Sequence, residues 1–372
     1  MKVTHLTYDM RIGGTEMVIK NIIEGNLNSA INMSIFCIEE PIGPWGETLQ
    51  SNGIDIYSKA RKPGFDINLV QVIRRHLKEH KIDILHCHQY TPWVYGALAA
   101  AFTNTKVIFS EHGRFYPDSK SSKRRLVNPL LTKLTDKITT ISLATKNALN
   151  EFEYIPFKKI DVIYNGIREL NIKSDRLEQL RLFLSLPTDA YILGTVARFD
   201  PIKNHSLMLE AFARAKKVNP HLFLIMVGDG QERPNIEAKI LELKLKKCVK
   251  LVGYQPDPSH YLALFDVFLL SSLSEGTSMT LLEAMSLSTP CIVTDAGGNP
   301  EIIENNFNGL VTPNENVDAF AKAIVQLSTE DLTVMQVNAR QRFETQFTNK
   351  IMVQKYATIY KKMVGGSVEA FH

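Results

Sequence analysis

Short apolar, β-branched runs alternate along this chain with longer stretches whose apolar positions recur at helical spacing. The short runs are typical of strands buried on both faces, and the longer stretches are typical of the helices that connect parallel strands. The alternation predicts an α/β protein with two doubly wound parallel sheets. The predicted strands are 3–8, 34–38, 55–57, 84–88, 107–111, 137–141 and 161–163 in the first half, and 191–197, 222–227, 249–252, 267–271, 290–293 and 310–312 in the second.

The length of 372 residues exceeds what a single core usually supports and suits two α/β domains. The turn Asn165-Gly166 and the polar stretch after it predict a boundary, which gives domains at 1–168 and 169–350. A last amphipathic pattern predicts a helix over about 351–364. Ligands of open α/β sheets bind beyond the carboxyl ends of the strands, so we expect a ligand-binding crevice between the two domains.

The composition, with 44% hydrophobic and 22% charged residues, is that of a soluble globular protein. The first predicted strand lacks the pattern of a signal peptide, and no apolar run approaches the ~18 residues of a membrane span. Four scattered cysteines are typical of reduced thiols, so we expect a cytoplasmic protein. Residues 1–170 carry a net charge of +5 and the remainder −1, which suggests that the first half faces something anionic.

Two glutamates eight residues apart, Glu275 and Glu283, lie where a strand pattern gives way to a helical one. This junction places one carboxylate in a loop, the other within a helix, and the free amides of the helix N-terminus between them. Glu275 has no obvious local partner. Glu283 has a structural alternative, because Thr280-x-x-Glu283 matches a capping box with Glu283 at the third helical position.

Arg198 and Lys203 follow the first predicted strand of the second half, and together they can neutralise a diphosphate without a metal ion. The alternative is a solvated loop in which Arg198 pairs with Asp200. Gly13-Gly14 follows the first strand of the chain and precedes a helical pattern, so the backbone can approach a ligand there. The alternative is a flexible loop with Thr15 as a helix N-cap.

These motifs resemble those of retaining glycosyltransferase family 4, whose fold of two Rossmann-like domains is called GT-B. Glu275 to Glu283 is similar to the E-x7-E motif of that family, and Arg198 to Lys203 is similar to its G-R-x-x-x-x-K loop, with Ala197 where glycine is commoner. The resemblance spans nearly the whole chain. It also includes Gly13-Gly14-Thr15-Glu16, Val162-Ile163-Tyr164-Asn165-Gly166-Ile167, Leu251-Val252-Gly253-Tyr254 and Gly297-Gly298-Asn299-Pro300-Glu301.

The resemblance implies a role for each position. Arg198 and Lys203 would bind the donor diphosphate, Glu275 the transferred sugar and Glu283 the ribose. His112 matches the active-site histidine of the family, with an ordinary loop histidine as the alternative. The other implied donor-binding residues are Gly13, Gly14, Asn165, Gly253, Gly276, Thr277, Ser278, Met279 and Thr280, and Arg114 is expected to line the acceptor site.

The implied reaction is front-face attack by an acceptor hydroxyl, whose proton passes to the departing phosphate. The bond to phosphate breaks with oxocarbenium character, and the cationic loop stabilises the leaving nucleoside diphosphate. The chain has no obvious protein nucleophile. It also lacks the D-x-D motif that binds metal in the other glycosyltransferase fold, so we expect neither a divalent metal nor a cofactor.

His86 and His88 lie two apart on a predicted strand, which puts both rings on one face and suggests a metal site. No third ligand is evident nearby, and the family has a comparable strand end near its acceptor cleft, so acceptor lining or structural packing is favoured over zinc. The basic segment 120–131 suggests peripheral contact with an anionic membrane, with a solvated helix as the alternative. Pro129 is expected to interrupt a helix there unless it lies in the first turn.

The sequence thus predicts a retaining hexosyltransferase, cytoplasmic or peripheral at the inner face of the membrane. It would move a sugar from a UDP-linked donor to a glycan or lipid-linked acceptor in surface polysaccharide or lipopolysaccharide biosynthesis. Nucleic acid is not an expected partner, and uridine is favoured by family frequency alone. Two alternatives stay open: a non-catalytic regulatory subunit that binds nucleotide sugars or glycans, and a GT-B sugar-nucleotide epimerase.

Overall fold

The computed structural model describes residues 1–26, 30–113, 118–172 and 174–365 of the chain. It divides into two compact units. Unit 1 contains residues 1–166 together with the C-terminal segment from Asn349, and unit 2 contains Ile167–Thr348. Within the described residues, no helix is both long and apolar enough to cross a membrane.

Unit 1 is built on a seven-stranded parallel sheet with the strand order β3-β2-β1-β4-β5-β6-β7. The order reverses between β1 and β4, which makes their carboxyl ends a topological switch point, the usual place for a ligand in such sheets. The strands are β1 Lys2–Thr7, β2 Asn32–Cys37, β3 Ile56–Ser58, β4 Ile84–His88, β5 Lys106–Glu111, β6 Lys137–Thr140 and β7 Ile160–Val162.

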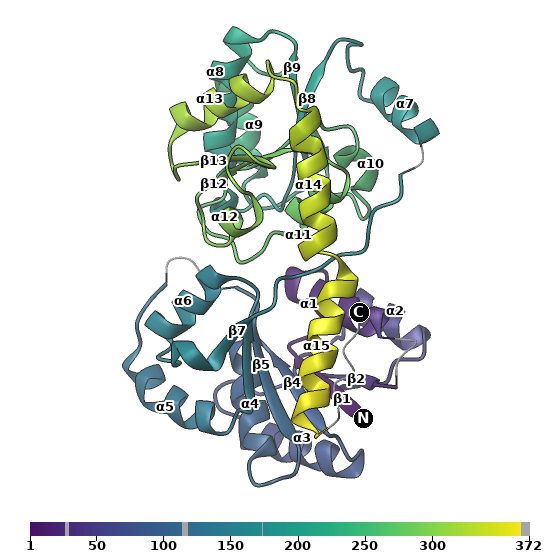
Figure 1. Ribbon diagram of the computed structural model, residues 1–372, viewed down its shortest axis with the longest axis vertical. Coiled ribbons are helices and arrows are strands. Elements are labelled where there is room, and N and C mark those ends of the chain that lie inside the picture. The colour runs from purple at the N-terminus through teal and green to yellow at the C-terminus, as the bar shows by residue number, and fades with distance from the viewer. Residues whose placement is uncertain (27–29, 114–117, 173, 366–372) are drawn as a thin grey trace. The chain divides into compact units, whose positions relative to one another are not determined.

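Side chains alternate along β4, so its two faces pack against different helices. Leu85 and Cys87 point at one face, where they lie so close to Gly96 of α4 that a Cβ there would clash with both. His86 points at the other face, where its ring bonds to Tyr360 of α15. Helices α1 and α15 also contact one another in unit 1 (Figure 1). The helices of unit 1 are α1 Gly14–Gly25, α2 Pro44–Ser51, α3 Ile67–Glu79, α4 Tyr90–Ala100, α5 Ser122–Lys133, α6 Leu143–Phe152 and α15 Asn349–Met363, with a 3-10 turn at Phe157–Lys159.

Unit 2 repeats this plan with a six-stranded parallel sheet in the order β10-β9-β8-β11-β12-β13. Its switch point lies between β8 and β11. The strands are β8 Tyr191–Val196, β9 Leu222–Val227, β10 Val249–Gly253, β11 Val267–Leu270, β12 Cys291–Thr294 and β13 Gly309–Thr312. The helices are α7 Ser174–Phe183, α8 His205–Val218, α9 Arg233–Glu242, α10 Ser259–Leu262, α11 Met279–Ser286, α12 Asn299–Ile302, α13 Val317–Leu327 and α14 Thr333–Gln346, with a 3-10 turn at Pro201–Lys203.

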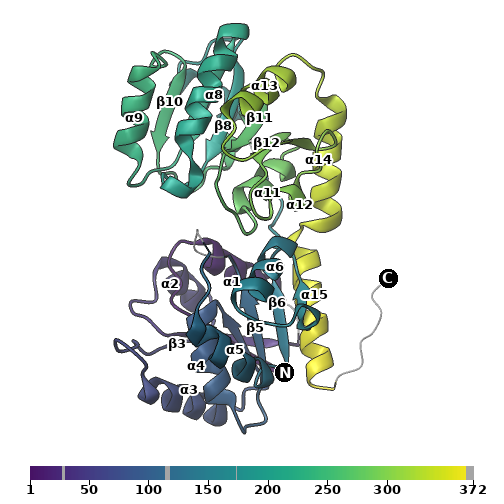
Figure 2. The ribbon, with the colours of Figure 1, turned by 90° about the vertical axis from the view of Figure 1, so that its left-hand side faces the viewer.

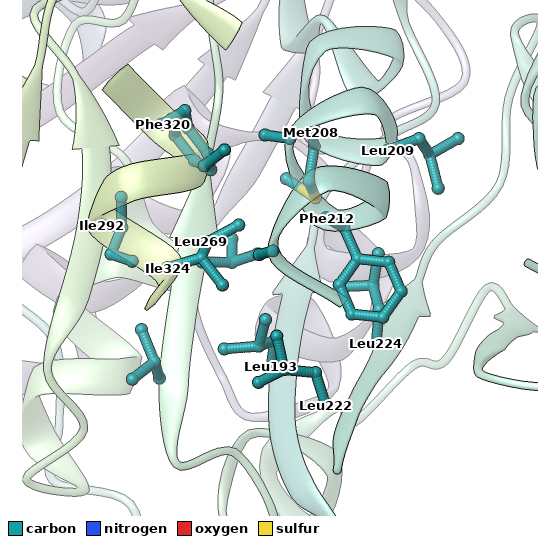
Figure 3. Close-up of a cluster of buried hydrophobic side chains, with 14 of the residues drawn as sticks. Leu193, Met208, Leu209, Phe212, Leu222, Leu224, Leu269, Ile292, Phe320 and Ile324 are labelled. Carbon is teal, nitrogen blue, oxygen red and sulfur yellow. The ribbon is translucent and has the colours of Figure 1, made fainter. Parts of the chain in front are cut away.

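Helices α8 and α13 lie side by side over one face of the unit 2 sheet (Figures 1 and 2). Their apolar side chains meet those of the central strands in a core of fully buried residues (Figure 3). Phe212 of α8 and Phe320 of α13 are among the largest side chains in it. Burial of a phenylalanine or leucine contributes roughly 1.5–3 kcal/mol, so this core fixes the strands whose ends carry the candidate site.

All thirteen predicted strands are present, with ends shifted by at most two residues. Two local predictions are wrong. The polar stretch predicted as a linker ends inside α7, which begins at Ser174. Pro129 lies well inside α5 and does not interrupt it, and the adjacent Asn128 anchors this part of the helix to the rest of unit 1. Asn128 donates to both the backbone oxygen and the carboxylate of Glu153, and the Tyr90 hydroxyl donates to it at 2.6 Å.

Candidate active site

The loops that follow β8 and β11 of unit 2 are tied together at the switch point of the sheet. The backbone N–H of Leu273 donates to the carbonyl of Ile202 at 2.8 Å, and the Ser271 hydroxyl lies 2.9 Å from the carbonyl of Lys203. Buried hydrogen bonds of this kind hold two otherwise irregular loops in one arrangement. Most of the predicted donor-binding residues lie on these loops or on the helix that follows.

Glu275 and Lys203, one from each loop, form an ion pair. The Lys203 ammonium donates to Glu275 Oε1 at 2.5 Å, and the Ser272 hydroxyl donates to the same oxygen at 2.6 Å. The side chain of Glu275 is only 9% exposed. The prediction that Glu275 has no local partner is therefore wrong, because Ser272 lies only three positions before it. Lys203, 72 positions away in the chain, reaches Glu275 once the sheet has formed.

Glycines fix the backbone of both charged loops. Gly297 has a φ of +55°, and a Cβ at this position would lie 1.9 Å from the carbonyl oxygen of Glu275. The Gly298 N–H donates to that same oxygen at 3.0 Å. Gly228, with a φ of +141°, approaches the carbonyl of Ala197 equally closely. Only glycine combines these backbone angles with such close contacts, so the two loops are held by backbone as well as by charge.

Arg198 is the most exposed of the predicted site residues in unit 2, with 76% of its side chain accessible. Its guanidinium pairs with the Asp200 carboxylate at 2.9 Å, so the ion pair given above as the alternative is present. Exposed pairs contribute about 0–1 kcal/mol, because solvent screens them. The guanidinium can therefore leave Asp200 for a ligand at little cost.

Helix α11 begins at Met279, with Ser278 as its N-cap. Glu283 is thus the fifth helical residue, and the predicted capping box is wrong. The Ser278 hydroxyl makes no cap bond and instead lies 3.1 Å from that of Thr280. The first amides of a helix have no partner within it and carry the positive end of its dipole, so this terminus suits an anion. Gly276 and the buried Thr277 lie in the loop just before it.

Glu283 is half-buried, and its carboxyl group is incompletely paired. Its Oε2 atom has no hydrogen-bond partner among the residues that the structure describes. Burial, with a smaller contribution from the negative charge of Asp257, raises the pKa of Glu283 to about 7. Unpaired buried carboxyl groups with raised pKa values cluster at functional sites, and hydroxyl groups of a ligand would complete this one.

Two more of the predicted donor-binding residues lie elsewhere. Gly253 ends β10 of unit 2 with a φ of +76°, and its carbonyl accepts from the Gly228 N–H at 2.9 Å. Asn165 is buried at the end of the first segment of unit 1, and its Oδ1 atom finds no partner in the described part of the chain. Gly253 is thus held by a backbone hydrogen bond within unit 2, whereas Asn165 belongs to unit 1.

In unit 1, the glycine-rich turn leads directly into α1. Gly13 is the N-cap and Gly14 the first helical residue, so the alternative with Thr15 as N-cap is wrong. A Cβ added at Gly14 would meet nothing within 4 Å, which leaves room for a ligand against the backbone. Burial, assisted by Asp9, raises the pKa of the nearby Glu16 to about 7. This turn thus combines an open helix terminus with a carboxyl group that titrates near neutral pH.

His112 follows β5, and its ring lies against that of His88. The two rings are stacked with centroids 5.0 Å apart, and His112 Nε2 is 2.8 Å from His88 Nδ1. Its other nitrogen, Nδ1, is buried without a hydrogen-bond partner among the described residues. The His112 ring thus has a partner within unit 1, and its part in the reaction stays a prediction. Arg114, the other residue predicted near it, lies outside the described residues.

His86 and His88 are fully buried, which fits structural packing, one of the two roles predicted for them, and acceptor lining stays a prediction. The prediction that no third histidine is near is wrong. His5 of β1 brings its ligand atom within 4.8 Å of those of His86 and His88. Strand pairing explains this, because β1 lies beside β4 with His5 directly opposite His86.

Two models of known protein families match the chain. Residues 178–347 match the family model described as Glycosyl transferases group 1, and residues 12–169 match the model described as Glycosyltransferase Family 4. The chain belongs to glycosyltransferase family 4. As a member of this family it is a glycosyltransferase.

Relatives of this glycosyltransferase cover its whole length. It is 27% identical, over 98% of its chain and 97% of the relative, to the Escherichia coli protein named UDP-Gal:alpha-D-GlcNAc-diphosphoundecaprenol alpha-1,3-galactosyltransferase. It is 29% identical, over 82% of each chain, to N-acetyl-alpha-D-glucosaminyl L-malate synthase of Bacillus anthracis.

Solved structures share its fold. A glycosyltransferase from Rickettsia africae superposes with a TM-score of 0.87 at 22% identity, covering 98% of this chain and 99% of the other. HepE of Anabaena, solved in complex with UDP, superposes with a TM-score of 0.86 at 21% identity, covering 97% and 100%. These matches confirm the predicted GT-B architecture of two Rossmann-like domains.

Several contacts of this glycosyltransferase were not predicted from the sequence. Ser272 and the glycines at 228 and 297 support the charged loops, and Asp257 acts on Glu283. Gly297 belongs to a motif of the resemblance, but its contact with Glu275 was not predicted. Ser272, Gly228 and Asp257 have no distinctive spacing, so a single sequence offers no signal for them. His5 differs, because the strand order β2-β1-β4 is the usual one for this fold class and would have placed it beside His86.

Proposed function

We propose that this family 4 enzyme is a retaining, metal-independent transferase that moves a hexose-type sugar from a UDP-linked donor to a glycan or lipid-linked acceptor. The observation that carries the proposal is the Lys203–Glu275 pair, which joins a phosphate-binding cation to a sugar-binding carboxylate. Support for the substrate class comes from relatives. One is named for UDP-Gal and a diphosphoundecaprenol acceptor, and another was solved with UDP-glucose.

The ion pair suits an exchange of partners on donor binding. A lysine ammonium has three donors, and Lys203 uses one of them on Glu275. A diphosphate that arrives at the loop competes for the ammonium, with Arg198 and the N-terminus of α11 as further cationic partners. Glu275 is then released to accept hydrogen bonds from sugar hydroxyls. Before the donor binds, the ion pair holds both charged side chains in position.

The ribose is assigned to Glu283. A ribose diol supplies two hydroxyl donors, and the buried Oε2 atom of Glu283 has unused acceptor capacity. Because its pKa is raised to about 7, the carboxyl group binds the diol with a full charge above neutral pH and as a mixed population below it. Donor affinity is then expected to be greater at pH 8 than at pH 6.

The chemistry follows from stabilising the leaving group. The bond between the anomeric carbon and the phosphate oxygen breaks, and a bond from the acceptor oxygen forms on the same face. The acceptor proton passes to the departing phosphate, so no protein group is left modified. Preorganised cations that stabilise such developing charge contribute roughly 10²–10³ in rate for each strong interaction.

Donor turnover tests this proposal. We expect the purified enzyme to release UDP slowly from one UDP-sugar in the presence of EDTA, and to transfer that sugar with retention when given an acceptor. Glu275→Gln removes the charge while keeping the size of the side chain, and we expect it to lower kcat by roughly 100-fold. A coupled assay of UDP release measures kcat, and NMR of the product gives the configuration at the anomeric carbon.

Glu330→Gln, at an exposed glutamate outside these loops, is the matched control and should change kcat little. Inversion at the anomeric carbon, or dependence on a divalent metal, would contradict the corresponding part of the proposal. Tight UDP binding with no turnover toward any acceptor would instead support a non-catalytic subunit. Interconversion of nucleotide sugars without an acceptor would support an epimerase.

A lipid-linked acceptor requires access to a membrane, and α5 of unit 1 offers a suitable surface. Leu126 and Leu130 are 75% and 63% exposed on it, one turn apart, with the exposed Lys123 and Arg125 beside them. Arg124, by contrast, is paired with Glu153. An outward face of leucines flanked by basic residues is typical of helices that lie at anionic membrane interfaces.

We expect the enzyme to sediment with vesicles that contain anionic lipid and to stay in solution with neutral vesicles. Leu126→Asp with Leu130→Asp should lower the partition coefficient at least about tenfold, because each buried leucine contributes roughly 1.5–3 kcal/mol. Leu182→Asp, at a leucine that is 79% exposed on α7 of unit 2, is the control and should have little effect. Equal binding of both leucine variants would contradict membrane contact through α5.

A further inference from the structure

Two buried histidines of unit 1 and the half-buried His112, the candidate active-site histidine, form a hydrogen-bonded row. His5 Nδ1 lies 2.9 Å from His88 Nε2, and His88 Nδ1 lies 2.8 Å from His112 Nε2. The residues come from the carboxyl-terminal halves of β1 and β4 and from the position after β5, which are neighbouring strands (Figure 1). His5 and His88 are fully buried, so neither has another evident role in ligand binding.

The two ends of this row lack partners. His5 Nε2 and His112 Nδ1 are both buried and accept or donate no hydrogen bond within the described residues. Burial lowers the pKa of His5 and of His112 to about 3, and it lowers that of His88 well below its usual value. All three rings are therefore neutral near pH 7, and each carries a single N–H.

Three neutral rings in a row allow only two arrangements of protons. In the first, every ring is protonated on Nδ1, His5 donates to His88, His88 donates to His112, and the Nδ1–H of His112 is free to donate. In the second, every ring is protonated on Nε2, and the row runs in the opposite direction. The first arrangement leaves the N–H of His112 without an acceptor, and the second leaves that of His5 without one. His5 is 0% exposed within the sheet, whereas His112 is only half-buried at the position after β5. A bound ligand can therefore satisfy the free N–H only at the His112 end, which favours the first arrangement.

His86, the fourth ring of the cluster, belongs to a separate network. Its Nδ1 lies 2.7 Å from the hydroxyl of Tyr360, and its Nε2 lies 2.6 Å from that of Ser110. With both nitrogens engaged, His86 helps to attach α15 to the sheet and takes no part in the row. It therefore serves as an internal comparison for the cost of altering a buried histidine in the same place.

A metal ion explains the cluster less well than hydrogen bonds. Zinc holds imidazole nitrogens at about 2.1 Å, which separates two ligand atoms by roughly 3.4 Å in a tetrahedral site. The 2.9 Å between His5 and His88 is an ordinary hydrogen-bond length. The candidate group also contains no carboxylate or thiolate and includes His86, whose nitrogens are already used.

We propose that His88, supported by His5, is a positioning residue that holds the His112 ring with its proton on Nδ1 and directs that N–H toward an oxygen atom of the bound donor or acceptor. The part that concerns substrate rests on the proposed function. A neutral donor in a fixed tautomer costs no reorganisation when charge develops on a substrate oxygen. His88 orients the His112 ring in the way that a hydrogen-bond partner orients a metal-bound histidine.

The tautomer of His112 is the direct test. Protein labelled with ¹⁵N in histidine gives long-range ¹H–¹⁵N correlations that distinguish the two neutral tautomers, and the spectrum of His112→Gln assigns the ring. We expect His112 in the wild-type enzyme at pH 7.5 to be protonated on Nδ1. Protonation on Nε2 would overturn the proposal, and so would stoichiometric bound metal in the purified protein.

Two substitutions at His88 form a matched pair. The amide nitrogen of asparagine occupies nearly the place of Nδ1 in histidine, so His88→Asn retains a donor to His112. The amide of glutamine occupies nearly the place of Nε2, so His88→Gln retains the contact with His5 and loses the donor. We expect the asparagine variant to keep the tautomer and the glutamine variant to give a mixture. His86→Gln should lower the melting temperature without changing the tautomer.

Kinetics then connect the row to turnover. We expect His88→Gln to lower kcat roughly 10- to 100-fold with a smaller change in KM, and His88→Asn to restore most of that loss. Equal tautomers and equal kcat in the two variants would show that His88 only fills space. If the wild-type enzyme turns over no nucleotide sugar although His112 carries its proton on Nδ1, the proposed function fails while the positioning of the ring stands.

Discussion

Lys203→Ala is expected to lower kcat for donor turnover by roughly 100- to 1,000-fold, the loss typical of removing one preorganised charge from a transition state. The substitution removes a cation that stabilises the departing diphosphate. It also leaves Glu275, only 9% exposed, with the Ser272 hydroxyl as its remaining side-chain partner, so a negative charge then faces the phosphates uncompensated. Steady-state release of UDP over a range of donor concentrations measures the effect.

Controls separate charge from folding. Lys217→Ala removes an exposed lysine from the opposite end of α8 in unit 2 and should leave kcat nearly unchanged. Lys203→Arg keeps the charge but not the compact ammonium, and we expect it to recover part of the activity. In a Glu275→Gln background, Lys203→Ala should cost less than in the wild type, because the two groups interact directly. If the losses in kcat from Lys203→Ala and Glu275→Gln are independent in this double-mutant cycle, the proposed exchange of partners is wrong.

Lowering the pH from 7 to 5 is expected to unfold unit 1 while unit 2 stays folded. Unit 1 holds five histidines whose pKa values are depressed by burial: about 3 for His5 and His112, about 4 for His76, and well below normal for His86 and His88. Each is neutral when folded and free to take up a proton when unfolded, so the stabilisation is complete above pH 6.5 and is lost progressively toward the folded pKa.

The magnitude of this effect is comparable to the stability of a domain. A histidine with an unfolded pKa of about 6.5 loses roughly 2 kcal/mol between pH 7 and pH 5. Glu16, with a pKa of about 7, acts in the opposite direction, because folded unit 1 binds its proton more tightly. The net loss for unit 1 is about 8 kcal/mol, within the 5–15 kcal/mol of a typical domain. In unit 2 the losses from His205, with a pKa of about 4, and the gains from Glu283, with a pKa of about 7, nearly cancel.

Tryptophan fluorescence distinguishes the two units, because both tryptophans of the chain, Trp45 and Trp93, belong to unit 1. We expect a fluorescence transition centred between pH 5 and 6, where far-UV circular dichroism still reports the strands and helices of unit 2. A second step in circular dichroism should follow at lower pH. Coincident transitions of both signals, or a fluorescence midpoint below pH 4, would contradict the buried neutral histidines.

The elements of the fold could be read from local pattern, since strand and helix periods are set by which positions must face the core. The ends of the strands then located the charged and glycine-rich loops, because ligands of these sheets bind there. The wrong predictions of local structure lie where a tertiary contact outweighs the local sequence pattern. Pro129 lies within a helix whose adjacent residue, Asn128, is held by Glu153. The capping box at Thr280 does not form because α11 begins at Met279, which places Glu283 beyond the third helical position.

The sequence alone determined the two doubly wound sheets, their strands and the order of the charged residues along the chain, because each of these depends on periodicity or on short spacing. Only the tertiary structure decided which residues meet. It paired Glu275 with Lys203, left a buried oxygen of Glu283 without a partner among the described residues, and set His5 and His88 in line with His112. Such contacts join segments far apart in sequence, and they depend on strand order and burial, which no local pattern encodes.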